Sequence, residues 1–218
     1  MSDDDIHEMA SILRRLVTSW RTPAVTIVSQ REGNPFKVLI SCILSLRTQD
    51  QTTGPASERL FSLADSPQRI LKLSAADIEK AIYPVGFYRN KARQILDICA
   101  VLLERHGGKV PSDINELLTL KGVGRKTANL VVTLGFGKPG ICVDTHVHRI
   151  TNRWGYVETR SPEETEYALR AKLPAEYWLE INDLLVTFGQ NHCRPQSPYC
   201  STCLLTAFCA RRGVTTSR

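Results

Sequence analysis

Four cysteines near the C-terminal end of the chain have the residue type and the spacing of a metal site. Cys193, Cys200, Cys203 and Cys209 follow the pattern C-x6-C-x2-C-x5-C. Thiolates are soft ligands, which iron–sulfur clusters and zinc select. Zinc ribbons usually hold two C-x2-C pairs about 15–20 residues apart. Only one such pair is present, so an iron–sulfur cluster is the first interpretation and zinc the second.

The segment that carries these cysteines differs from the rest of the chain. It contains Pro195 and Pro198 and has little apolar content before Leu204. Such a segment cannot build a core of its own, so we expect a metal to order it. Three further cysteines have apolar neighbours and are expected to be buried thiols: Cys42, Cys99 and Cys142.

A second candidate site is the sequence LKGVGRKTA at residues 120–128. Gly122 and Gly124 allow a tight turn and the close approach of another backbone. A helix is expected to begin near Arg125, and the amide groups at its start could bind a phosphate. Three residues add positive charge around the turn: Lys121, Arg125 and Lys126. The alternative is an ordinary turn with a solvated basic face.

A third candidate is Asp144, in the sequence VDTHVHR at residues 143–149. Aspartate is a preferred N-cap residue, so we expect it to cap a helix that runs toward Trp154. A cap carboxylate is held rigidly and kept ionised by amide groups. It could therefore also serve in catalysis.

The elements that must position these residues are helical nearly throughout. Asn34 and Pro35 predict a helix start, and residues 36–46 form an apolar run that indicates a buried helix, although a strand remains an alternative. Residues 131–135 are expected to continue the helix that begins at Arg125. Alternating strand patterns are nearly absent, so the sequence predicts an all-α fold.

Other helix boundaries follow from capping signals. Ser74 with Asp77, and Ser161 with Glu164, are typical of capping boxes. A helix containing Ile95, Cys99 and Leu102 is expected to end at Gly107.

Charge and composition narrow the class of partner. The 218 residues carry a net charge of +6, which favours nucleic acid first and an anionic membrane surface second. The acidic N-terminal segment is not a signal peptide, and no apolar run approaches the about 20 residues of a membrane span. We expect no membrane association and a cytoplasmic, nucleoid-associated location.

Together these features resemble the endonuclease III family of DNA repair enzymes. The sequence LKGVGRKTANLVV resembles the family's helix-hairpin-helix, VDTH its second catalytic segment, and the four cysteines its cluster loop. Residues 34–50 match its early buried helix and residues 86–92 its wedge loop. The resemblance implies a six-helix barrel domain with the hairpin, at residues 28–138. It also implies an iron–sulfur cluster domain built from residues 1–27 and 139–218.

The resemblance also implies a role for each site residue. Lys126 would attack C1′ of a flipped nucleotide, Asp144 would stabilise the sugar cation, and the four cysteines would hold a 4Fe–4S cluster. Nine residues are expected to contact DNA: Arg47, Phe87, Lys91, Lys121, Gly122, Val123, Gly124, Arg125 and His146. The expected partner is double-stranded DNA with damaged bases or abasic sites, bound by a monomer.

The function implied is that of a bifunctional glycosylase and AP lyase that removes oxidised pyrimidines and cleaves the strand by β-elimination. Alternatives are a pyrimidine-dimer, mismatched-thymine or adenine-mismatch glycosylase, and a non-enzymatic DNA-binding or redox protein. Arg47 stands where many bacterial members have glutamine, and Arg194 is the one basic residue between Cys193 and Cys200. For Phe87, the alternative to a wedge is a core residue.

Overall fold

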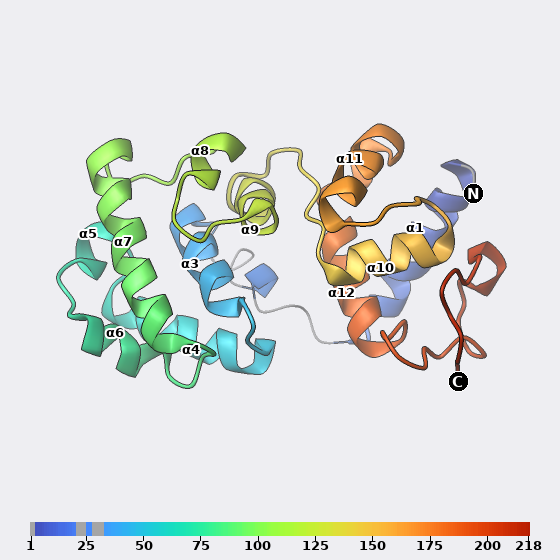
Figure 1. Ribbon diagram of the computed structural model, residues 1–218, viewed down its shortest axis with the longest axis horizontal. Coiled ribbons are helices and arrows are strands. Elements are labelled where there is room, and N and C mark those ends of the chain that lie inside the picture. Colours follow the sequence, from blue (N-terminus) through green and yellow to red (C-terminus); the bar gives the residue numbers. More distant parts are fainter. Residues whose placement is uncertain (1–2, 21–24, 28–32) are drawn as a thin grey trace. The chain divides into compact units, whose positions relative to one another are not determined.

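The computed structural model describes residues 3–20, 25–27 and 33–218, and they divide into two compact helical units (Figure 1). Unit 1 comprises Met1–Pro23 and Ile141–Arg218, and unit 2 comprises Ala24–Gly140. The sequence predicted that the chain passes from one domain to the other after residues 27 and 138. In the structure, the unit boundaries follow residues 23 and 140. Within the described ranges no strand occurs, which confirms the all-α prediction.

Unit 2 is built around helix α3 (Pro35–Ser45), which packs against three other helices of the unit. The remaining elements of this unit are α4 (Asp50–Leu63), α5 (Pro67–Ile70), α6 (Ala75–Ile82), α7 (Tyr88–His106), α8 (Ile114–Leu118), α9 (Arg125–Leu130) and a π-helical turn (Val131–Gly135). The Asn34 side chain accepts a hydrogen bond from the Phe36 amide at 2.9 Å. The predicted cap is thus confirmed, and the strand alternative for residues 36–46 is wrong.

The capping box predicted at Ser74 is confirmed, whereas the one predicted at Ser161 forms one of its two hydrogen bonds. Ser74 and Asp77 form both bonds of a capping box. Ser161 accepts from the Glu164 amide, but the Glu164 carboxylate accepts from the amide of Arg160. The φ angle of Ser161 is −137°, against −73° at Ser74.

The helix that begins at Arg125 does continue through residues 131–135, but in a wider form. The Thr133 hydroxyl donates to the carbonyl of Asn129 at 2.8 Å. That carbonyl is the one that the Thr133 amide would use in an α-helix, so the side chain competes with the regular bond. The chain responds with a π-helical turn, a form that is frequent near functional sites.

Unit 1 has its own apolar core. Its helices are α1 (Asp3–Val17), α10 (Thr145–Trp154), α11 (Pro162–Lys172) and α12 (Ile181–Asn191), with short 3-10 turns at Ala175–Tyr177 and Thr206–Phe208. Met9, Leu185 and Phe188 are among its fully buried residues. Among the helices described, none is both long and apolar enough to cross a bilayer.

The three cysteines that the sequence placed in the core are indeed buried. Cys42, Cys99 and Cys142 are at most 1% exposed, and none of the three is in a disulfide. Burial raises the pKa of the Cys42 thiol to about 12, and does the same for Cys99. Cys42 and Cys99 are therefore neutral packing residues.

Candidate functional site

The hairpin at residues 120–124 is held from the apolar core and from α7. Val123 is buried and its amide donates to the Leu120 carbonyl at 3.0 Å. The Gln94 amide of α7 donates to the Lys121 carbonyl at 2.9 Å. Gly122 has a φ of +75°, and a Cβ there would lie 2.3 Å from the Gln94 nitrogen. The positive φ favours glycine at this position, and a Cβ there would displace the end of the Gln94 side chain.

Helix α9 begins at Arg125, as the sequence predicted, directly after this hairpin. Its N-cap is Gly124, which has no side chain to cover the first amides of the helix. Lys126 is exposed at the second helical position and Arg125 is half-buried. Lys121 is exposed and paired with Asp97 at 3.1 Å. The hairpin therefore presents backbone amides and cationic side chains together.

Arg47 and Phe87 form a second exposed feature of unit 2. The guanidinium carbon of Arg47 lies 5.6 Å from the centre of the Phe87 ring. Phe87 is 60% exposed, so the interpretation of this residue as core is wrong. Both residues have positive φ angles, 53° and 58°, which are costly for side chains other than glycine.

Lys91 is not placed to contact DNA, and that prediction needs correction. The side chain is buried, with 5% exposure. Its ammonium donates to the carbonyls of Leu44 and Leu46 and to the Thr48 hydroxyl. An ammonium has three hydrogens. All three have acceptors inside unit 2, which leaves none for a phosphate.

In unit 1, Asp144 caps α10 as predicted. One carboxylate oxygen accepts from the amides of His146 at 2.8 Å and Val147 at 2.9 Å. His146 is half-buried, and its Nδ1 lies 3.0 Å from the Arg149 guanidinium. His146 also borders a hollow of about 420 Å³, lined further by Gly189, Gln190, Arg194, Pro195 and Gln196.

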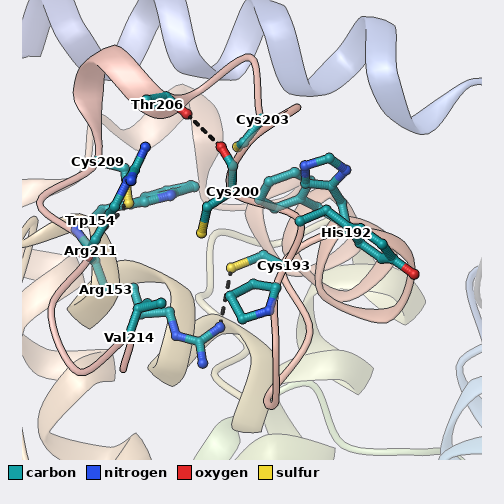
Figure 2. Close-up of a pocket in the computed structure, with 13 residues that line it drawn as sticks. Arg153, Trp154, His192, Cys193, Cys200, Cys203, Thr206, Cys209, Arg211 and Val214 are labelled. Carbon is teal, nitrogen blue, oxygen red and sulfur yellow. Dashed lines mark hydrogen bonds between the residues drawn. The ribbon is translucent and has the colours of Figure 1, made fainter. Parts of the chain in front are cut away.

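The four cysteines of the predicted metal site line one pocket, which Figure 2 shows. Arg153 donates to the Cys193 sulfur at 3.5 Å, and the Arg211 amide donates to the Cys209 sulfur at 3.4 Å. Burial, and then the neighbouring cysteines, raise the pKa of the thiols of Cys203 and Cys209. Over the described part of the chain, no three His, Cys, Asp or Glu side chains lie close enough together to hold one metal ion.

Two arginines of α10 hold the start of the cysteine loop, and the sequence interpretation missed this role. Arg149 donates to the Cys193 carbonyl at 2.8 Å. Arg153 donates to the carbonyls of Arg194 and Pro195, each at 2.7 Å. The available signal was their spacing of four residues, which places both on one face of the helix after Asp144.

Comparison with known proteins identifies the class. A profile described as "HhH-GPD superfamily base excision DNA repair protein" matches residues 40–175. The fold and the hairpin are therefore those of a helix-hairpin-helix base excision repair protein. Lys126 and Asp144 belong to units 2 and 1, respectively, and both lie within the matched residues.

More specific relatives narrow the assignment. Endonuclease III of Thermotoga maritima is 49% identical over 188 residues, covering 85% of this chain and 88% of that protein. Endonuclease III-like protein 1 of Gallus gallus is 46% identical over 177 residues, covering 80% of this chain but 63% of that longer protein.

Solved structures of similar fold support the same family assignment. A non-covalent endonuclease III–DNA complex matches with a TM-score of 0.84 at 34% identity, covering 97% of this chain and 96% of that chain. A trapped endonuclease III–DNA covalent intermediate matches with a TM-score of 0.83 at 34% identity, covering 97% of each chain. The chain belongs to the endonuclease III family.

Proposed function

We propose that this chain removes oxidised pyrimidines from double-stranded DNA and uses Lys126 to cleave the strand at the abasic site that results. The chain is a base excision repair DNA glycosylase and AP lyase, because its family and its structural neighbours carry that activity. The single observation that supports the role of Lys126 is its place. It is an exposed amine on the first turn of α9, directly after the Gly122–Gly124 hairpin.

The first requirement is access to the base. A base in a duplex is stacked and paired, so the enzyme must flip the nucleotide out, at a cost of a few kcal/mol. The exposed Phe87 ring is suited to fill the gap that is left, since apolar side chains inserted between base steps stabilise an opened duplex. The hairpin amides and Arg125 would hold a phosphate of the same strand.

The second requirement is chemistry at the sugar. The neutral amine of Lys126 forms a bond to C1′ while the C1′–base bond breaks and the base leaves. Loss of a proton from the nitrogen and opening of the sugar ring give an imine. The imine acidifies the C2′ hydrogen. Its removal expels the 3′ phosphate and cleaves the strand 3′ to the lesion. The Asp144 carboxylate would stabilise the positive charge on the sugar as the base departs.

The pocket of four cysteines would hold a 4Fe–4S cluster. All four thiols line this one pocket. A 4Fe–4S cluster is held by four Cys thiolates, so this donor set suits it. Hydrogen bonds from Arg153 and Arg211 to two of the sulfurs are of the kind that tunes such clusters. When bound, the cluster would supply the ordering of residues 193–209.

Borohydride trapping tests this function. Sodium borohydride reduces an imine to a stable amine, so the wild type should become covalently attached to abasic DNA. Lys126→Gln should bind the same DNA and remain untrapped, because the hairpin amides are unchanged. Lys72→Gln, at an exposed lysine that is not part of the hairpin, serves as the control and should be trapped as the wild type is. Efficient trapping by Lys126→Gln would show that another amine is the nucleophile.

A further inference from the structure

One face of α7 touches the turns of unit 2 that are expected to contact DNA. Phe87 is the N-cap of this helix, and Lys91, Gln94 and Asp97 follow at intervals of four, three and three residues. This spacing places them on one side of the helix. Gln94 and Asp97 hold the hairpin through Lys121. Lys91 holds the other turn, at residues 44–48.

Lys91 closes the C-terminal end of α3 from a separate helix. The last carbonyls of a helix have no partner within the helix, and the end carries a partial negative charge. The Lys91 ammonium supplies hydrogen bonds there, to the carbonyls of Leu44, at 2.8 Å, and Leu46. Its third bond goes to the Thr48 hydroxyl at 3.2 Å. The turn between α3 and α4 is therefore tied to α7.

The same group of hydrogen bonds extends to the loop that carries Phe87. The Thr48 hydroxyl also accepts from the Gly86 amide at 3.1 Å. The two segments are in close contact, since a Cβ on Gly86 would lie 2.7 Å from the Arg47 carbonyl oxygen. Lys91, Thr48 and Gly86 thus join the residue before Phe87 to the residues on both sides of Arg47.

The residues held in this way are strained. Of the described residues, four other than glycine have a positive φ: Arg47, Phe87, Ser197 and Arg211. Two of them lie in this one place. Each such conformation is costly and persists only where the surroundings enforce it. In this arrangement the Arg47 guanidinium lies over the exposed Phe87 ring.

We propose that Lys91 is a positioning residue, which keeps Arg47 and Phe87 as one preformed unit that enters the duplex where a nucleotide is flipped out. This inference rests on the proposed function, and it assigns Lys91 no contact with DNA or substrate. A unit ordered before binding avoids the cost of ordering two side chains and two turns on the DNA. Loss of the Lys91 bonds releases the strain, and the pair separates.

The inference predicts a selective defect. Excision of a base from a duplex requires the stack to be opened and the gap filled. An abasic site in single-stranded DNA has no paired base to expel, so flipping costs least there. A variant without the Lys91 ammonium should therefore be slow on duplex bases and still form the imine on single-stranded abasic DNA. Failure of the proposed function itself would instead appear as absent trapping in the wild type.

The test compares Lys91→Met, which keeps the length of the side chain, with the wild type. Single-turnover excision of an oxidised pyrimidine from duplex DNA should fall by about tenfold or more, as expected when buried hydrogen bonds are lost from a preorganised group. The fluorescence of 2-aminopurine placed next to the lesion, which rises when stacking is broken, should rise less than with the wild type. Trapping on single-stranded abasic DNA should stay within about twofold of the wild type, or about 0.4 kcal/mol, because no paired base has to be expelled there.

Two further variants keep the inference testable if Lys91→Met does not fold. Thr48→Val removes the bridging hydroxyl and leaves Lys91 in place, so it should show the same selective loss, and Thr48→Ser should restore excision. Lys72→Met, at an exposed lysine of unit 2, is the matched control. Normal duplex excision by a folded Lys91→Met or Thr48→Val would overturn the inference. Equal losses in duplex excision and in single-stranded trapping would also overturn it.

Discussion

The hairpin of unit 2 and the cysteine loop of unit 1 are both irregular segments, yet they are held by different interactions. The hairpin places Leu120 and Val123 in the apolar core, at 2% and 5% exposure. Between Cys193 and Cys209, the buried residues are Pro198 and Leu205. That loop depends instead on short turns and on the arginines of α10.

This difference determines how much of the folded structure of each segment remains after a single substitution. Apolar burial stabilises the hairpin whether or not a ligand is present. The cysteine loop has little burial of its own, so the energy of metal binding is a large part of its folding energy. A substitution of a metal ligand in the loop should therefore remove the order of the whole loop, whereas a substitution in the hairpin should reduce its stability only in part.

The largest effect is expected from Cys203→Ala. Removal of one of four thiolate ligands should abolish the cluster, and with it the yellow-brown absorbance near about 400 nm and the order of residues 193–209. Absorbance, iron content and hydrogen exchange of the loop amides would measure this loss. Cys99→Ala, at a buried thiol of unit 2, should keep its colour. A colourless wild type with stoichiometric zinc would contradict the cluster assignment.

The next effect concerns Asp144→Asn. The amide keeps an oxygen for the amides of His146 and Val147, so the free energy of unfolding should change by about 1 kcal/mol or less. The negative charge that we propose stabilises the sugar cation is lost, so base excision should slow by at least about a hundredfold.

Asp113→Asn is a matched control for that change. Asp113 caps α8 with the same pair of bonds, to the amides of Asn115 at 2.8 Å and Glu116 at 3.1 Å. The Asp113→Asn protein should excise the base at the wild-type rate. Near-normal excision by Asp144→Asn would reduce Asp144 to a helix cap.

A smaller, graded effect is expected from Gly122→Ala. The new Cβ meets the Gln94 amide and adopts a positive φ, so the hairpin should lose the bond from Gln94 to Lys121. We expect a loss of about 1–3 kcal/mol in stability, with weaker DNA binding. Gly137→Ala has a similar φ of +62° but open space around its Cβ, so it measures the strain alone. Equal effects of both variants in urea unfolding would argue against a role of Gln94.

The smallest effect is a pH dependence from Lys91. Burial lowers the pKa of Lys91 from 10.5 to about 8. The folded state then releases its proton before the unfolded state does, so stability should rise with pH between about 8 and 10.5. Cys42 and Cys99 act in the opposite direction above pH 9, because their pKa values are raised to about 12 in the folded state.

These opposing contributions cancel when two proteins are compared. From pH 8 to 9, the free energy of unfolding of the wild type should rise by about 1 kcal/mol more than that of Lys91→Met. Urea unfolding at both pH values measures this difference. Parallel curves would show that Lys91 keeps its proton in the folded state.

Local signals in the sequence determined much of this protein. The caps at Asn34 and Asp144 and the helix end at Gly107 were all predicted correctly. Each depends on hydrogen bonds or backbone angles within a few residues, so the neighbouring sequence contains the cause. The exceptions are also local in origin but depend on competing geometry, as at Glu164 and in the π-helical turn.

Tertiary structure alone decided which charged side chains face inward. Lys91 is indistinguishable from a surface lysine by its neighbours in sequence, and its acceptors lie 43 to 47 residues away. Arg153 likewise bonds to carbonyls more than 40 residues further along the chain. A buried charge is stable only where the fold supplies its hydrogen bonds. Such partners are brought together by the packing of helices that are distant in the sequence. A local sequence pattern therefore does not reveal them.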